Sequence, residues 1–294
     1  MGGRVAVLGL GRMGAALAST LLKRGYQVAV WNRTAAKMQP LVEAGALASS
    51  SPADALAGAE TIILCVGSYA DTLDLLGDYA GFEGRTVVQL TTGSRQEAES
   101  LRLRVEAAGG AFLAGGILAY PSQIGSRDTM LILAGAATAW ESCAAIVRCL
   151  GGASMYTGED FAAPSAMGFA LAIPSLMASI GLMLGLHALE RAGMDPAPYA
   201  RSIAGLSRSL SSELERQAQA VCADRYEATE ATLGTWAAAF RDAWVPDLIE
   251  AGTASGREVL ASVLQPLGEF LTRGVTAGHG DEDLMSAIKV LRQP

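Results

Sequence analysis

The sequence predicts an α/β fold in two parts, with a doubly wound parallel sheet in the N-terminal half and helices alone after Gly158. Apolar runs alternate with helical stretches over residues 1–158, which is typical of strands connected by helices. These runs are continuous rather than alternating in hydrophobicity, as expected for strands that are covered on both faces. A glycine-rich turn follows the first run, as in nucleotide-binding domains of the Rossmann type.

Each short apolar run is expected to form a strand, at residues 4–10, 27–31, 61–66, 86–90, 111–117 and 129–134. Helices are expected between and after them, at residues 13–24, 35–44, 69–76, 96–108 and 140–150. The C-terminal half predicts helices at residues 161–189, 195–223, 228–252, 255–277 and 281–291. We therefore expect a Rossmann domain over residues 1–158, an interdomain helix over 159–192 and an all-helical domain over 193–294.

The composition excludes several classes of protein. With 294 residues, of which 51% are hydrophobic and 17% charged, the chain has enough apolar side chains for two folded domains. A net charge of −7 without a basic run argues against nucleic-acid binding, which depends on phosphate neutralisation. The two histidines and four cysteines form no CxxC or HxxxH pair, so no metal site or disulfide framework is expected. Scattered cysteines, and an N-terminus without a cleavable apolar segment, predict a cytoplasmic protein.

Residues 161–189 contain no Asp, Glu, Lys or Arg, and this stretch is long enough to cross a bilayer. It is, however, rich in Ala, Ser and Gly, it contains Pro164 and Pro174, and it lacks flanking basic clusters and an aromatic belt. We therefore expect a buried helix and no membrane. A helix that is apolar all round must be covered on every side, so a second subunit is expected to cover it.

The first strand runs into Gly9-Leu10-Gly11-Arg12-Met13-Gly14, a GxGxxG motif between a strand and a helix. The first glycine permits the tight turn, the second lets backbone amides approach a pyrophosphate, and the third lets the helix pack on the strand. The amides at the start of the helix supply the positive end of its dipole. This context predicts a dinucleotide site rather than a glycine-rich turn without a ligand.

The residues after the second strand predict NADPH rather than NADH. An NAD site usually has an acidic residue here to bind the ribose 2′-hydroxyl. This chain has Asn32, Arg33, Thr34 and Lys37 instead. The guanidinium of Arg33 suits a 2′-phosphate, and the other side chains add a hydroxyl and a second cation. The alternative is a solvated basic loop.

Two further strand ends are expected beside the nicotinamide half of the cofactor. Cys65, Val66 and Gly67 follow one strand, and their small size permits a close approach. Thr91 follows the next strand. Cys65 is expected to be a packing residue, because no histidine or cation lies near it in sequence to activate the thiol.

Several motifs are similar to those of the 6-phosphogluconate and β-hydroxyacid dehydrogenase superfamily, namely GLGRMG, NRT at residues 32–34 and LTTGS at residues 90–94. The stretches ATEATLGTWAAAF (228–240) and AGHGDEDLMSAIKVLR (277–292) resemble imine reductases and reductive aminases. The resemblance extends from Arg4 to Arg292. It implies an NADPH-dependent homodimer with interlocked helical domains, and an active site between the Rossmann domain of one subunit and the helices of the other.

The position where this family carries a proton donor holds a glycine. β-Hydroxyacid dehydrogenases have a lysine early in the interdomain helix, and imine reductases usually have Asp or Tyr there. Our alignment places Gly168 at this position, with Met167 and Phe169 adjacent, and none of the three can donate a proton. No lysine occurs between Lys37 and Lys289, which argues against oxidation of hydroxyacids.

Three explanations of the missing acid stay open. The substrate could arrive already protonated, or as a permanent iminium ion. Another hydroxyl could donate the proton, and Tyr120, in GILAYPSQIG, is the best candidate. The third explanation is a protein that binds NADPH without ordinary turnover. Thr92 matches the family position where Ser, Thr or Asn approaches the substrate, although a helix-capping role is an equal alternative.

Trp236 and Phe240 are expected to share a helix face, where they either line the substrate pocket, with Met167 and Gly168, or pack in a core. For GHGDED (278–283) we expect a structural role, with glycines that end one helix and acids that favour the start of the next. The sequence thus predicts NADPH-dependent reduction of imines or iminium ions, most readily cyclic ones. A β-hydroxyacid-type dehydrogenase and an NADPH-binding homologue with reduced catalysis are the alternatives.

Overall fold

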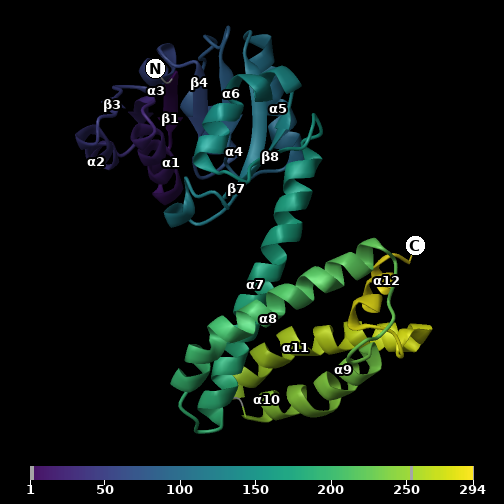
Figure 1. The fold of residues 1–294 in the computed structure, drawn as a ribbon. Helices are drawn as coiled ribbons and strands as arrows, with labels where there is room; N and C mark the ends of the chain where they lie inside the picture. The colour runs from purple at the N-terminus through teal and green to yellow at the C-terminus, as the bar shows by residue number, and fades with distance from the viewer. Residues whose placement is uncertain (1–2, 252–253, 294) are drawn as a thin grey trace. The chain divides into compact units, whose positions relative to one another are not determined.

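The computed structural model describes residues 3–251 and 254–293. The chain forms two compact units, Met1–Leu176 and Met177–Pro294. The long helix α7 (Ala162–Arg191) contributes residues to both units (Figure 1). An α/β unit is followed by a helical one, so the predicted fold class is confirmed, while the exact domain limits stay a prediction.

The first unit is built on one sheet with the strand order β3-β2-β1-β4-β5-β6-β7-β8. The strands are β1 (Arg4–Leu8), β2 (Gln27–Trp31), β3 (Leu47–Ala48), β4 (Thr61–Leu64), β5 (Thr86–Gln89), β6 (Ala111–Leu118), β7 (Met130–Gly135) and β8 (Met155–Tyr156). The helices are α1 (Arg12–Lys23), α2 (Gln39–Glu43), α3 (Pro52–Ala57), α4 (Tyr69–Leu76), α5 (Arg95–Ala107) and α6 (Ala137–Leu150).

Both faces of this sheet are covered. On β1, Val5 and Val7 belong to a core that also contains residues of α1 and α6. The alternate residues Ala6 and Leu8 belong to a second core, with residues of α3, α4 and α5. Successive side chains of a strand point to opposite faces, so these two cores explain the continuous hydrophobicity of the strand sequences.

Two features of the sheet differ from the expectation. β7 pairs with β6 antiparallel, whereas the other pairs are parallel. A parallel neighbour needs a crossover connection of about a dozen or more residues, usually a helix, and only a short loop with the 3₁₀ turn η2 (Pro121–Gln123) separates these two strands. The short strands β3 and β8 and helix α3 were also missed, because elements of this length leave little periodicity in the sequence.

The second unit is helical over the residues that the structure describes. It contains the end of α7, α8 (Ala197–Cys222), α9 (Leu233–Ala239), the π-helical segment η3 (Phe240–Trp244), α10 (Val245–Ala251), α11 (Ala254–Gly274), a second π-helical segment η4 (Val275–His279), the 3₁₀ turn η5 (Leu284–Ala287) and α12 (Ile288–Leu291). The helix expected from residue 228 begins five residues later, at Leu233. Glu227 and Thr232 form isolated bridges with Glu282 and Asp283, and the Thr232 side chain caps α9. The expected end of that helix, at residue 252, lies outside the described residues.

The GHGDED segment has the structural role that the sequence predicts. Gly278 adopts a φ of 92°, which ends the regular helix, and the buried Asp283 caps η5 by accepting a hydrogen bond from the Met285 backbone N–H. Glu282 pairs with Lys289 at 2.7 Å and with His279 at 3.3 Å. These contacts hold the C-terminal turn together within the second unit.

The second unit has a small core and a large apolar surface. Its buried cluster consists of Val245, Leu260 and Leu264 with a few half-buried neighbours. Helix α7 contains a long, strongly apolar stretch that is not buried, and by length and composition this helix could cross a membrane. One such helix is weak evidence for a membrane span, since subunit interfaces present the same pattern.

Candidate functional site

The glycine-rich turn after β1 is built as a dinucleotide cradle. Gly9 has a φ of 92°, and a Cβ atom there would lie 2.4 Å from the Cys65 carbonyl oxygen. A Cβ atom on Gly14 would lie 1.8 Å from the Gly9 carbonyl oxygen, whereas one on Gly11 would meet nothing within 4 Å. Gly9 and Gly14 are thus required by packing, and Gly11, at the start of α1, leaves open space in front of the helix amides.

A cavity of about 640 Å³ lies in front of this turn. All the predicted cofactor-binding residues except Leu10 and Thr91 line this cavity. The lining residues among them are Gly9, Gly11, Arg12, Met13, Gly14, Asn32, Arg33, Thr34, Lys37, Cys65, Val66 and Gly67. Leu10 is buried, and its backbone N–H donates to Asn32 Oδ1 at 2.9 Å. The size and lining of this cavity fit a dinucleotide.

The Asn32 side chain stabilises the loop after β2, because both of its polar atoms form hydrogen bonds within the protein. Its Oδ1 accepts from Leu10, and its Nδ2 donates to the Thr34 carbonyl oxygen at 3.1 Å. Arg33, Thr34 and Lys37 line the same cavity and are exposed. These three side chains are therefore the ones available to a 2′-phosphate.

Sequence reasoning missed part of this cavity. Trp31, Pro52, Asp71, Asp74 and Leu75 also line it. Trp31 ends β2 and could have been found from its place at the carboxyl edge of the sheet, where ligands bind in such folds. The other four lie on α3 and α4, and no local motif marks them.

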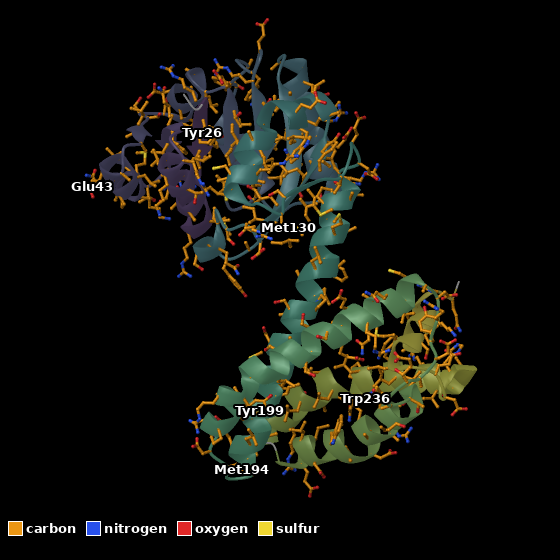
Figure 2. The ribbon with its side chains drawn as sticks, in the orientation of Figure 1. Tyr26, Glu43, Met130, Met194, Tyr199 and Trp236 are labelled. Atoms are coloured by element: carbon orange, nitrogen blue, oxygen red, sulfur yellow. The ribbon has the colours of Figure 1, made fainter. Side chains whose placement is uncertain are left out.

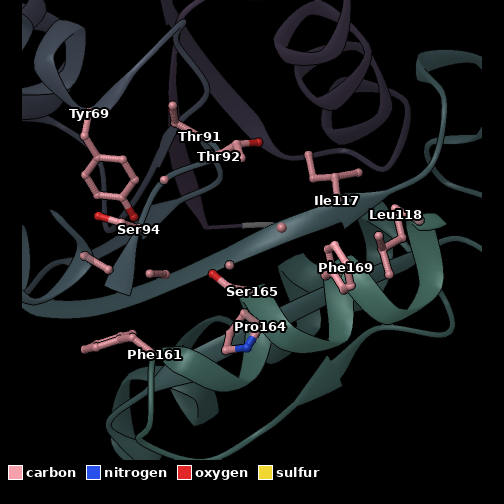
Figure 3. A pocket seen from close by; sticks show the side chains of 17 residues that line it. Tyr69, Thr91, Thr92, Ser94, Ile117, Leu118, Phe161, Pro164, Ser165 and Phe169 are labelled. Carbon is pink, nitrogen blue, oxygen red and sulfur yellow. The ribbon is translucent and has the colours of Figure 1, made fainter. Parts of the chain in front are cut away.

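A second cavity, of about 420 Å³, lies in the first unit between the loops after β5, the end of β6 and the beginning of α7 (Figure 3). Its lining is mostly apolar, with Phe161, Pro164 and Phe169 from the region of α7. The hydroxyl groups come from Tyr69, Thr91, Thr92, Ser94 and Ser165. No Asp, Glu, Lys, Arg or His is among the described residues that line it.

A hydrogen bond links the two cavities. Thr91 lines the second cavity and is buried, and its Oγ1 accepts from the backbone N–H of Val66, which lines the first, at 3.1 Å. The loops after β4 and β5 are thus held together at the carboxyl edge of the sheet. Beside them, burial raises the pKa of the Cys65 thiol to about 11, so this cysteine stays protonated and is not an activated nucleophile.

The predicted catalytic and substrate residues are partly brought together. Thr92 and Gly168 line the second cavity, and Met167 does not. Tyr120 follows the end of β6, has a side chain that is 72% exposed, and is not among the lining residues. Its catalytic role stays a prediction from the sequence.

Trp236 and Phe240 belong to the second unit, where their side chains pack against different residues. The Trp236 ring packs edge to face on Trp244, with ring centroids 5.9 Å apart, and is 39% exposed. Phe240 packs against the small core of the unit, close to Gly268. The π-helical segment begins at Phe240, so the change in helical register falls between Phe240 and Trp244 and not between Trp236 and Phe240.

Tyr69 was missed as a site residue, although it stands at the carboxyl edge of the sheet. It is the first residue of α4, after the N-cap Ser68, whose hydroxyl accepts from the Asp71 backbone N–H at 3.0 Å. Its side chain is only 5% exposed and lines the second cavity. The order of strands in a doubly wound sheet could have indicated this position, because β4 lies next to the central strand β1.

Among the described residues, no group of three or more His, Cys, Asp or Glu side chains is placed to hold a metal ion.

Comparison with known proteins identifies the family. The family model for the NAD binding domain of 6-phosphogluconate dehydrogenase matches residues 4–158. The chain is 31% identical over 296 aligned residues to an NADPH-dependent reductive aminase from Aspergillus oryzae, an alignment that covers 99% of this chain and 98% of the relative.

Solved structures agree with this result. A reductive aminase from Aspergillus terreus, in complex with NADPH and ethyl levulinate, is 27% identical with a TM-score of 0.88, and the match covers 99% of this chain and 100% of the other. An imine reductase from Myxococcus stipitatus, in complex with NADP+, is 28% identical with a TM-score of 0.88, over 98% and 99% of the two chains. The cofactors of these relatives are of the kind predicted from the loop after β2. The chain belongs to the imine reductase and reductive aminase family, within the superfamily of NAD(P)-dependent oxidoreductases related to 6-phosphogluconate dehydrogenase.

Proposed function

We propose that this protein uses NADPH to reduce imines or iminium ions, preferentially cyclic ones, to amines. The observation that carries the proposal is the Val66–Thr91 hydrogen bond, which joins a dinucleotide cavity to a mostly apolar cavity at one edge of the sheet. NADPH supplies a hydride to the carbon of the C=N bond when it is bound. The relatives that cover the whole chain are reductive aminases and imine reductases, which supports the C=N bond as the target.

The residues of the second cavity orient the substrate in this proposal. Phe161 and Phe169 offer apolar walls for a hydrocarbon ring. The exposed hydroxyl of Thr92 is placed to hydrogen-bond a nitrogen. Because Gly168 carries no acid, a neutral imine needs its proton from another group, whereas an iminium ion needs none. Tyr120 is the donor predicted from the sequence.

The proposed assembly is a homodimer with interlocked helical domains, in the cytoplasm, in which the active site is completed by the partner. Support comes from the apolar side chains that one chain leaves exposed, such as Phe169, Met183 and Leu210 at 68%, 61% and 42%. Covering such a surface with protein is favourable by roughly 25 cal/mol per Å² of apolar area removed from water. A second copy covers α7 with protein rather than lipid.

The direct test measures NADPH consumption by the purified protein with cyclic imines and with matched N-methyl iminium salts. Turnover of either series supports reduction of C=N bonds. Activity on 3-hydroxyacids with NADP+, without turnover of imines, would support a β-hydroxyacid-type dehydrogenase instead. NADPH binding without turnover across both panels would favour a homologue with reduced catalysis.

The loop after β2 is expected to set the cofactor preference. Arg33→Ala removes a guanidinium from the group proposed to hold the 2′-phosphate, so kcat/KM with NADPH should fall by about 10-fold to 100-fold. NADH lacks this phosphate, so its kcat/KM should stay within about twofold, on the scale of a neutral surface substitution. Steady-state kinetics with both cofactors measure the ratio. Equal losses with NADPH and NADH would show that Arg33 does not recognise the phosphate.

The position of Gly168 in α7 is expected to tolerate an acidic side chain. A Cβ atom on Gly168 would meet nothing within 4 Å, so Gly168→Asp has room in the second cavity. The added carboxylic acid should raise kcat on weakly basic imines by roughly 10-fold or more, because general acids typically contribute 10²–10⁴-fold. Gly168→Asn is the uncharged control and should give no gain. A folded, NADPH-binding Asp variant without a gain contradicts the placement of the proton donor at this position.

A further inference from the structure

The second cavity contains one ionisable side chain among its described lining residues, the phenol of Tyr69. Reduction of a neutral imine leaves a nitrogen that must take a proton. Among the other hydroxyl groups there, Ser94 donates to the Glu97 carboxylate at 2.8 Å, and Thr91 accepts from Val66. The hydroxyl groups of Ser94 and Thr91 are therefore already engaged in hydrogen bonds within the protein. Tyr69 has no hydrogen-bond partner for its hydroxyl within the described residues.

The packing around Tyr69 fixes the ring in place. A Cβ atom on Gly93 would lie 2.2 Å from ring atom Cε2, so the ring lies directly against the backbone of the loop after β5. The Ser68 cap fixes the start of α4. The ring is therefore held from two sides, and Figure 3 shows its hydroxyl directed into the cavity beside Ser94. A donor held in this way loses little conformational freedom when it binds a substrate.

We propose that the hydroxyl of Tyr69 donates the proton to the nitrogen of a neutral imine bound in the second cavity, in place of the acid that Gly168 cannot supply. This proposal rests on the proposed function. The C=N π electrons move to the nitrogen as the carbon receives its hydride from NADPH. The N–H bond forms as the Tyr69 O–H bond breaks. The phenolate that remains takes a proton from water.

The surroundings keep Tyr69 in the form that can donate. Burial raises the pKa of Tyr69, and the nearby carboxylate of Glu97 raises it further. The phenol is thus protonated throughout the neutral range before the reaction. The nitrogen becomes far more basic than a phenolate once it receives the electron pair, so the transfer is favourable despite the raised pKa.

The first test compares two classes of substrate. Tyr69→Phe keeps the ring against Gly93 and removes only the hydroxyl. We expect kcat/KM for neutral cyclic imines to fall by about 100-fold, and that for N-methyl iminium salts to stay within about threefold, because only the neutral substrate needs a proton. The matched control is Tyr26→Phe. Tyr26, which is labelled in Figure 2, lies in the same unit. It packs against the core and is not among the residues that line either cavity, so this variant should behave as the unmodified enzyme with both classes.

The second test measures binding without turnover. A lactam is a neutral ring with a hydrogen-bond acceptor, and a cycloalkene of the same size lacks the acceptor. In the complex with NADP+, Tyr69→Phe should raise the Kd of the lactam by about 10-fold, which corresponds to the loss of one hydrogen bond. The Kd of the cycloalkene should stay unchanged. Calorimetry measures both constants.

Each remaining outcome overturns the proposal. Similar losses of kcat/KM for imines and iminium salts would give Tyr69 a structural role only. A selective loss with Tyr120→Phe, but not with Tyr69→Phe, would assign the proton to Tyr120. If the unmodified protein turns over no imine, the proposed function fails, and the proton-transfer role fails with it. Turnover of imines without any effect of Tyr69→Phe would leave the proposed function intact and remove Tyr69 alone.

Discussion

Gly14→Ala is expected to weaken NADPH binding by at least about 100-fold, because the new methyl group cannot fit between α1 and the turn after β1. Its Cβ atom would lie 1.8 Å from the Gly9 carbonyl oxygen. Neither atom belongs to a flexible side chain, so the helix must move away from the strand. The amides that face the cofactor move with it. Overpacking of this kind also costs about 1–3 kcal/mol of stability.

Gly11→Ala is the matched control, because a Cβ atom at Gly11 would meet nothing within 4 Å. We expect this variant to keep its Tm and to bind NADPH about 10-fold more weakly, since the methyl group occupies space that the pyrophosphate would use. Differential scanning fluorimetry and fluorescence titration with NADPH measure the two quantities. Equal affinity in Gly11→Ala and the unmodified protein would contradict a pyrophosphate at this turn. A Gly14→Ala variant with normal affinity would show that the turn adapts.

Met183→Lys is expected to separate the proposed dimer and to reduce imine turnover by at least about 100-fold, while leaving cofactor affinity within about threefold. Met183 lies on α7 in the second unit, and its side chain is 61% exposed in one chain. If a second copy covers this helix, the substitution buries an unpaired ammonium group, which costs several kcal/mol. The cofactor cavity lies wholly in the first unit and is unaffected.

Leu103→Lys provides the control for an added charge. Leu103 is 56% exposed on α5 of the first unit, among polar neighbours, and we expect neither the mass nor the activity of the protein to change. Light scattering at several protein concentrations measures the oligomeric state of each variant. A Met183→Lys protein that stays dimeric and active contradicts the proposed covering of α7. An unmodified protein that is monomeric and active contradicts the homodimer itself.

Local sequence signals predicted the parts of this protein that depend on short-range physics. The strand β1, the GxGxxG turn and the start of α1 follow one another within residues 4–23, and the need for glycine there comes from contacts between near neighbours. The capping box at Ser94 and Glu97, which starts α5, likewise depends on two residues only three positions apart. Positions that depend on distant residues were harder, as the antiparallel β7 shows.

The cavity beside the cofactor site shows the same limit. Tyr69 and Gly93 are 24 positions apart, and their contact exists only because β4 and β5 are neighbours in the sheet. Tyr120 is also a phenol and was the proton donor predicted from the sequence, but its side chain is mostly exposed. A phenol can be found in a sequence, but whether it faces a cavity depends on the packing of the strand ends.

The sequence by itself thus determined the fold class, the dinucleotide turn and the type of cofactor, because hydrophobic periodicity, glycine positions and a change from acid to arginine act over a few residues. Only the tertiary structure decided which side chains, including which hydroxyl groups, line the second cavity. The physical reason is that a cavity is formed by segments from β4 to α7 that are far apart in sequence, and the order of strands in the sheet brings them together.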